Sequence, residues 1–185
     1  MATVEEKITE LQGVKNDIKQ ALINAGVDMT GVPFTGYAGK IAEGGKTYLY
    51  KDGDQCTNIT GGWTITPPEG AASGYETSFN KNGCLYCGGQ NSSTAYFITT
   101  NSINLSEYNR LVIEFYHEST ATDANTQFGV TNNNVSVIKM ALAQSFKSRV
   151  CYMGTSNLAN DKLQLWLWTG GYSITHLYIK RIWLE

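Results

Sequence analysis

The sequence is poor in charge. Lys, Arg, Asp and Glu together make up 16% of its 185 residues, whereas about a quarter is usual in globular proteins. The 14 basic and 16 acidic side chains give a net charge of -2 and form no basic stripe. Because binding to a nucleic-acid backbone requires clustered Lys and Arg, this composition argues against a nucleic-acid partner.

Long apolar runs are missing as well. No apolar stretch reaches the length of about 18 residues that a membrane-spanning helix requires, so we expect no membrane insertion. The opening residues MATVEEKITELQ are charged and amphipathic and lack the apolar segment of a secretion signal. We therefore expect a chain made in the cytoplasm without a signal peptide. Its four cysteines should be mostly reduced thiols; they are Cys56, Cys84, Cys87 and Cys151.

Signals for catalysis are few. The two histidines, His117 and His176, stand in separate strand-like segments, and neither belongs to a metal motif such as HExxH. The acidic residues are scattered, so no pattern orients a pair of carboxylates for acid–base chemistry. No GxSxG motif or nucleotide-binding glycine loop occurs. We expect a protein that is not an enzyme, and we assign no catalytic residue.

Two short motifs raise the question of a metal. The segment CLYC, residues 84–87, has the spacing of zinc ligands or of a redox pair, but the two remaining cysteines form no second such motif. The segment KDGDQ, with Asp52 and Asp54, resembles part of a calcium loop but lacks the glutamate of an EF-hand. Asp-Gly is equally typical of a tight turn. We predict no cofactor and no metal site, with a calcium ion at Asp52 and Asp54 as an open alternative.

The sequence predicts an amphipathic helix over residues 4–25. Apolar residues recur at steps of three and four, and Lys15 occupies the one slot that breaks the series. Thr3 and Glu6 form a capping box, and Gly26 is a natural stop. A helix of about six turns cannot bury its stripe against itself, so it packs on its own domain or on other copies as a coiled coil. We favour self-association, through Val4, Ile8, Leu11, Ile18 and Leu22.

From Thr47 onward the apolar period changes from 3.6 to 2. Eight or nine short strand-like runs follow, separated by turn formers such as DG, NKNG and TGGY. No helix of crossover length lies between them, which argues against parallel strands. We predict a mainly β fold: an antiparallel jelly-roll-type β-sandwich at residues 46–185, preceded by a helical oligomerisation or attachment module at residues 1–45. The segment IKMALAQSFKSR is either strand or a short helix.

Aromatic residues supply the candidate ligand site. In KLQLWLWTGGY, three leucines alternate with Gln164, Trp166 and Trp168, so the tryptophans share one face of a strand. Indole and phenol rings present a flat apolar surface with a polar edge, which suits a sugar ring. The alternatives are core packing and a subunit interface, and Trp183 is assigned to the core. The candidate glycan platform consists of Trp63, Tyr75, Trp166, Trp168 and Tyr172.

Two resemblances extend this interpretation. The segments ITELQGVKNDIKQALINAGVDM and PFTGYAGKI resemble a module of tail and baseplate-associated proteins of tailed bacteriophages and prophages. In that family the module precedes a variable β-rich distal domain. The remainder resembles jelly-roll carbohydrate-binding modules in layout, through YLYKDGDQCTNITGGWTI, INLSEYNRLVIEFYH and ITHLYIKRIWLE.

The resemblances imply a phage or prophage tail-associated structural protein. Its helix would form a homo-oligomer, with a homotrimer expected, and its sandwich would recognise a host-surface glycan. Its partners would be itself, other tail proteins and the host glycan, and its location the virion tail, where outside the cell a disulfide becomes possible. The alternatives are a stand-alone bacterial lectin-like module, a purely architectural part, and a glycan-cleaving enzyme, against which the missing acid pair argues.

Overall fold

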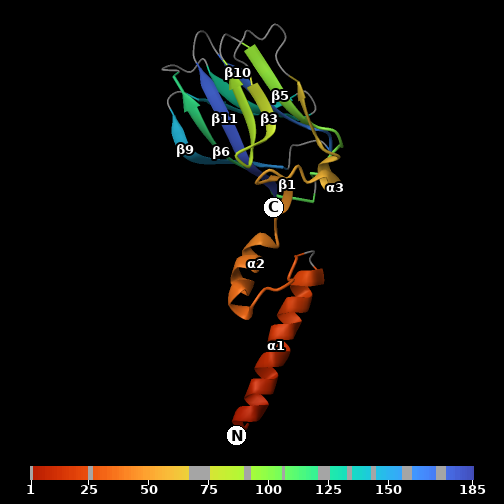
Figure 1. Cartoon of the computed structure of the whole chain (residues 1–185). Helices are drawn as coiled ribbons and strands as arrows, with labels where there is room; N and C mark the ends of the chain where they lie inside the picture. The colour runs from red at the N-terminus through yellow and green to blue at the C-terminus, as the bar shows by residue number, and fades with distance from the viewer. Residues whose placement is uncertain are drawn as a thin grey trace. The chain divides into compact units, whose positions relative to one another are not determined.

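The computed structural model describes residues 2–24, 27–66, 76–89, 93–105, 107–120, 126–132, 135–142, 145–155, 160–169 and 174–185. The chain divides into two compact units, Met1–Lys46 and Thr47–Glu185 (Figure 1). No helix among the described residues is both long and apolar enough to cross a membrane. The role of the first unit in oligomerisation or attachment stays a prediction.

The first unit consists of helix α1 (Val4–Asn24), a 3-10 turn η1 (Phe34–Gly36) and helix α2 (Tyr37–Glu43). Its capping box is confirmed, because the Thr3 N–H donates to Glu6 Oε2 at 2.7 Å and the Glu6 N–H donates to Thr3 Oγ1 at 3.2 Å. No residue of α1 is buried within this unit. Val4 is 74% exposed and Leu11 is 69% exposed. The apolar stripe of α1 is therefore exposed at Val4, Ile8 and Leu11, whereas Ile18 and Leu22 are half-buried.

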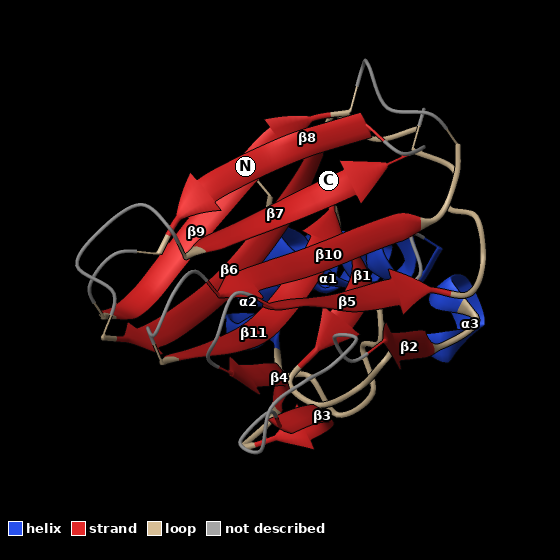
Figure 2. Ribbon diagram, turned by 90° about the horizontal axis from the view of Figure 1, so that it is seen from above, coloured by secondary structure: helices blue, strands red, loops and turns tan. Residues whose placement is uncertain are grey.

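The second unit is a sandwich of two antiparallel sheets, which confirms the predicted fold class. One sheet runs in the order β3-β4-β11-β6-β9, with β1 also on β11, and the other runs β2-β5-β10-β7-β8 (Figure 2). The six-stranded sheet contains β1 (Thr47–Lys51), β3 (Glu76–Lys81), β4 (Cys84–Gly89), β6 (Arg110–Ser119), β9 (Phe146–Gly154) and β11 (Thr175–Leu184). The five-stranded sheet contains β2 (Trp63–Thr66), β5 (Ser93–Thr99), β7 (Gln127–Asn132), β8 (Val135–Ala141) and β10 (Leu163–Thr169). A four-residue helix α3 (Thr57–Thr60) joins β1 to β2.

The core lies between the two sheets and follows from the strand alternation. Leu163, Leu165 and Leu167 of β10 are fully buried, while the residues between them are half-buried on the opposite side of the strand. The six-stranded sheet contributes Phe115 and Ile179 to the same cluster. The segment that was ambiguous between strand and helix forms the end of β8 and the start of β9.

The Asp-Gly motif forms a tight turn. The Lys51 N–H donates to the Asp54 carbonyl and the Asp54 N–H donates back to the Lys51 carbonyl, both at 2.9 Å. Asp52 and Gly53 adopt φ angles of 49° and 100°, the left-handed region that favours this pair. Arg181 Nε donates to both carboxylate oxygens of Asp52, at 3.2 and 3.1 Å. The Asp52 carboxylate thus serves an ion pair, which speaks against the calcium alternative.

All four cysteines are free thiols. Cys87 packs into the core, while Cys84, three residues earlier on β4, lines a hollow on the outer side of the sheet with Tyr116 and Lys180. Residues three apart on a strand face opposite sides. The two cysteines of CLYC therefore do not meet at one metal.

We expect Cys56 and Cys151 to be alkylated slowly in the folded protein. Burial raises the pKa of Cys56 to about 11 and likewise that of Cys151 to about 11, so both stay protonated at neutral pH. Because the thiolate is the nucleophile, iodoacetamide at pH 8 should label them about a hundredfold more slowly than an ordinary cysteine. The rate should climb as the pH approaches 11. Mass spectrometry measures the rate at which each cysteine is labelled. A labelling rate of Cys56 and Cys151 in the folded protein equal to that in the urea-unfolded chain would contradict this expectation.

Candidate ligand-binding face

The face of the five-stranded sheet that points away from the core carries the candidate site, and we call it the binding face. Figure 2 looks onto this sheet. Strand register arranges its side chains in rows that cross the strands. The middle row reaches all five strands and consists of Thr66, Tyr96, Trp166, Gly129 and Lys139. The flanking rows are Thr94, Trp168, Gln127 and Ala141 on one side, and Thr64, Ile98, Gln164 and Thr131 on the other.

Trp166 lies flat across the neighbouring strand β7. A Cβ atom built on Gly129, its cross-strand partner, would collide with Cζ2 and Cε2 of the indole. The indole Nε1–H donates to Thr131 Oγ1 at 3.1 Å. The missing side chain at Gly129 and the hydroxyl of Thr131 together fix the ring against the sheet, with its other side turned outward.

Around this ring the binding face forms a shallow groove of about 680 Å³. The groove combines two indoles, a phenol, two carboxamides, two hydroxyls and one ammonium, and no carboxylate occurs among its described lining residues. Flat apolar rings among uncharged hydrogen-bonding groups suit a ligand with apolar faces and a polar rim. The lining residues are Thr94, Tyr96, Gln127, Thr131, Lys139, Gln164, Trp166 and Trp168.

The aromatic rings that line the groove have ring surface left uncovered. In the described part of the chain, Tyr96, Trp166 and Trp168 stack on no other aromatic ring. Each of the three side chains is only half-buried. A flat ring that stacks on no other ring is available to stack on a ligand.

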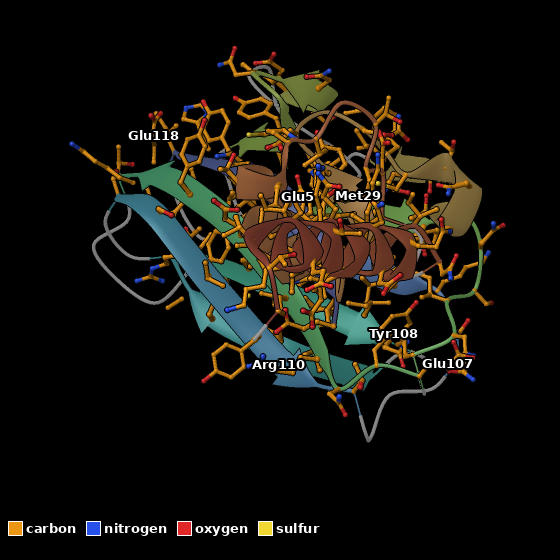
Figure 3. All side chains as sticks on the ribbon, turned by 90° about the horizontal axis from the view of Figure 1, so that it is seen from below. Glu5, Met29, Glu107, Tyr108, Arg110 and Glu118 are labelled. Carbon is orange, nitrogen blue, oxygen red and sulfur yellow. The ribbon has the colours of Figure 1, made fainter. Side chains whose placement is uncertain are left out.

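The outer face of the six-stranded sheet is different. There Tyr178 packs against Tyr86 and Tyr116, with ring centroids 4.9 and 4.4 Å apart, and Lys81 Nζ covers Tyr86 at 3.9 Å. Burial raises the pKa of all three phenols, which keeps them uncharged. Arg110 and Glu118, labelled in Figure 3, lie at opposite ends of β6 in this sheet. Because its rings stack on one another, this face offers no comparable platform.

The structure places the five predicted platform residues in different parts of the molecule or does not describe them. Trp166 and Trp168 share the binding face, where their role in binding stays a prediction. Trp63 is only 4% exposed, and its Nε1–H donates to the buried Leu49 carbonyl at 2.9 Å. Its assignment to the platform is therefore wrong, and Trp63 belongs to the core. Tyr75 and Tyr172 lie outside the described residues.

Sequence reasoning missed several members of the binding face. Tyr96 is signalled by the alternation in TAYFITT, where Ala95 and Phe97 are buried and Tyr96 faces outward. Gly129 and Lys139 carry no such signal, because their place beside Trp166 depends on the pairing of β7 with β10 and β8. The pairing of β7 with β8 is a local hairpin, but the pairing of β7 with β10 joins residues far apart in the chain, as Gly129 and Trp166 are.

We predict that Gly129→Ala disturbs the binding face. The added methyl group meets the Trp166 indole and the Ile138 carbonyl, so the ring must leave its position. The free energy of unfolding should fall by about 1–3 kcal/mol, the usual cost of overpacking, and the tryptophan signal in near-UV circular dichroism should change. Gly39→Ala is the matched control, because a Cβ at Gly39 meets nothing within 4 Å. Equal behaviour of the two variants would contradict the prediction.

Similarity to known proteins is found among solved structures. No family model matches the chain, and no curated protein matches it in sequence. Among solved structures it is similar to a point mutant of a family 29 carbohydrate-binding module, at 11% identity and a TM-score of 0.48, over 76% of this chain and 91% of the module. It is similar to a family 4 module (CBM4) at 11% identity and a TM-score of 0.46, over 75% and 95%. The K1 cleaved adhesin domain of Lys-gingipain from Porphyromonas gingivalis follows at 14% identity and a TM-score of 0.42, over 66% and 89%.

Proposed function

We propose that the β-sandwich binds a glycan on its binding face. The observation that carries this proposal is the pair of open, half-buried indoles of Trp166 and Trp168 in a groove of uncharged polar groups. A sugar ring has a C–H face, which stacks on an indole, and a rim of hydroxyls. Gln127, Gln164 and Thr94 supply donors and acceptors for that rim.

The dimensions of the binding face favour a chain of sugars over a single one. Trp166 and Trp168 stand two residues apart on β10 and are therefore about 7 Å apart along the strand. The middle row crosses five strands and spans about 19 Å, since neighbouring strands lie about 4.8 Å apart. A short oligosaccharide fits this extent, with one sugar ring on each indole.

Helix α1 would assemble the protein into a homotrimer. Its stripe follows the seven-residue spacing of a coiled coil: Val4, Leu11 and Ile18 repeat at one core position, and Ile8 and Leu22 at the other. Burial of this stripe between copies would cover the apolar surface that the first unit leaves exposed. A trimer presents three binding faces, so weak single-site contacts with a repetitive glycan reinforce one another.

Within this proposal the protein is a structural component of a phage or prophage tail that displays its sandwich toward the host surface. The opening helical module, which resembles those of tail and baseplate-associated proteins, supports this role, and other tail proteins are the partners it implies. Mass spectrometry of purified particles should detect the chain. Its absence from particles, with glycan binding retained, would favour the stand-alone lectin-like alternative.

The experiment that tests binding is a glycan array probed with the full chain. We expect a small set of related glycans to bind, and the same glycans to remain uncleaved, because the described lining of the groove holds no carboxylate or imidazole to act as acid or base. Release of new reducing ends from a bound glycan would revive the enzyme alternative. An array without any bound glycan would leave a purely architectural role.

A further inference from the structure

The binding face has a charge asymmetry that points to the chemical class of its ligand. We infer that the glycan carries an anionic group, a carboxylate or a phosphate, which Lys139 binds at the β8 end of the groove. This inference rests on the proposed function, since it concerns the ligand of the same face.

Lys139 stands directly beside the Trp166 platform. It is exposed on the edge strand β8, its cross-strand partner is Gly129, and the Trp166 indole covers Gly129. Lys139 also lines the groove. A sugar stacked on Trp166 directs its substituents outward from the rim of its ring, so a substituent on the β8 side comes within reach of the Lys139 ammonium.

The ammonium of Lys139 also lacks a counter-ion in the described part of the chain. It forms no ion pair there, and the described lining of the groove contains no carboxylate. On the other sheet, by contrast, Lys81 pairs with Glu76 at 2.6 Å and Arg181 pairs with Asp52 at 3.1 Å. The groove therefore presents one uncompensated positive charge.

An anionic substituent uses this charge better than a hydroxyl does. An ammonium has three donors and no acceptor, and its hydrogen bonds to a carboxylate or phosphate are charge-assisted and roughly twice as strong as neutral ones. Sugar hydroxyls are donors as well as acceptors, and the described lining offers them only amide and hydroxyl oxygens as acceptors. The balance of groups in the groove thus favours a glycan with a negative charge next to a stackable ring.

The test compares glycans that differ only in charge. An array of matched neutral, carboxylated and phosphorylated oligosaccharides is probed with the full chain and with Lys139→Gln, Lys162→Gln and Trp166→Ala, and the best pair is titrated by calorimetry. Lys162 is the matched control, because it is exposed, precedes Gln164 by two residues and does not line the groove. The carboxylated and phosphorylated arms distinguish the two sources of negative charge.

We expect a charged glycan to bind more tightly than its neutral counterpart. Lys139→Gln should lower that affinity by about fivefold at low salt, and 1 M salt, where the Debye length is about 3 Å, should remove most of the difference. Lys162→Gln should change the affinity by less than about twofold, as expected for an exposed charge outside the groove. Tighter binding of the neutral glycan, or no effect of Lys139→Gln on the affinity, overturns the inference about the anionic group. In that case the proposed function still holds if Trp166→Ala weakens the binding of the glycan. Absence of binding to every glycan contradicts both.

Discussion

Trp166→Ala should lower the affinity of the protein for its glycan by at least about thirtyfold, which corresponds to the loss of about 2 kcal/mol at an interface hot spot. The indole is the largest open ring of the middle row, it is held flat by Thr131 and by the space above Gly129, and it lines the groove. Its removal deletes one of the two indole surfaces on which a sugar stacks and leaves Trp168 as the remaining indole on β10. Titration calorimetry with a glycan identified on the array measures the change.

Tyr152→Ala is the matched control for this experiment. Tyr152 is 68% exposed and lies on β9 of the other sheet, so its loss removes an exposed ring of similar kind outside the groove. We expect the affinity of this variant to match that of the unaltered chain. Thermal unfolding of both variants excludes a general loss of fold. Equal losses of affinity in both variants, or none in Trp166→Ala, would remove Trp166 from the site.

Leu11→Asp combined with Ile18→Asp should convert the assembly into single chains of 20.3 kDa. Both residues lie at the same core position of the predicted coiled coil, and aspartate there would bury unpaired carboxylates between helices. Light scattering after size exclusion should show three times the chain mass before the change and one chain mass after it. A chain that is monomeric without any substitution, over a wide range of concentrations, would contradict the assembly proposal.

Lys15→Ile supplies the opposite change on the same helix. Lys15 occupies the core position shared with Ile8 and Leu22, where a polar residue lowers stability in exchange for a defined register. Replacing it with isoleucine should raise the melting temperature of the assembled helix. Glu10→Ile alters a position outside the core spacing and should leave the assembly unchanged, which distinguishes core packing from added helix hydrophobicity.

The sequence predicted what depends on local alternation and missed what depends on pairing. The run LQLWLW places Trp166 and Trp168 on one side of a strand, and the structure has them there. Trp63 was placed wrongly, because the short run GGWTIT does not reveal that its indole has a buried partner in the Leu49 carbonyl, which lies 14 residues earlier. Tyr75 and Tyr172 remain outside the described residues.

The sequence also predicted the tight turn between β1 and the segment that follows it. The Asp-Gly pair at residues 52 and 53 forms the expected tight turn. The number of strands was underestimated, since the described residues form eleven strands where eight or nine were expected. Lys139 shows the limit of such reasoning: the sequence marks it as an ordinary strand lysine, and it comes beside the tryptophan platform through the register of β8 on β7 together with the register of β7 on β10.

The central claim is that the outer face of the five-stranded sheet binds the glycan. The four indole N–H resonances in a proton–nitrogen correlation spectrum test it most directly, because Trp63 lies in the core and two tryptophans lie in the groove. The fourth, Trp183, was assigned to the core from the sequence, but it is half-buried on the six-stranded sheet between the buried Ile182 and Leu184 of β11. On titration with the bound glycan we predict that the signals of Trp166 and Trp168 move while those of Trp63 and Trp183 stay. Movement of the Trp183 signal with Trp166 and Trp168 unchanged would contradict the claim.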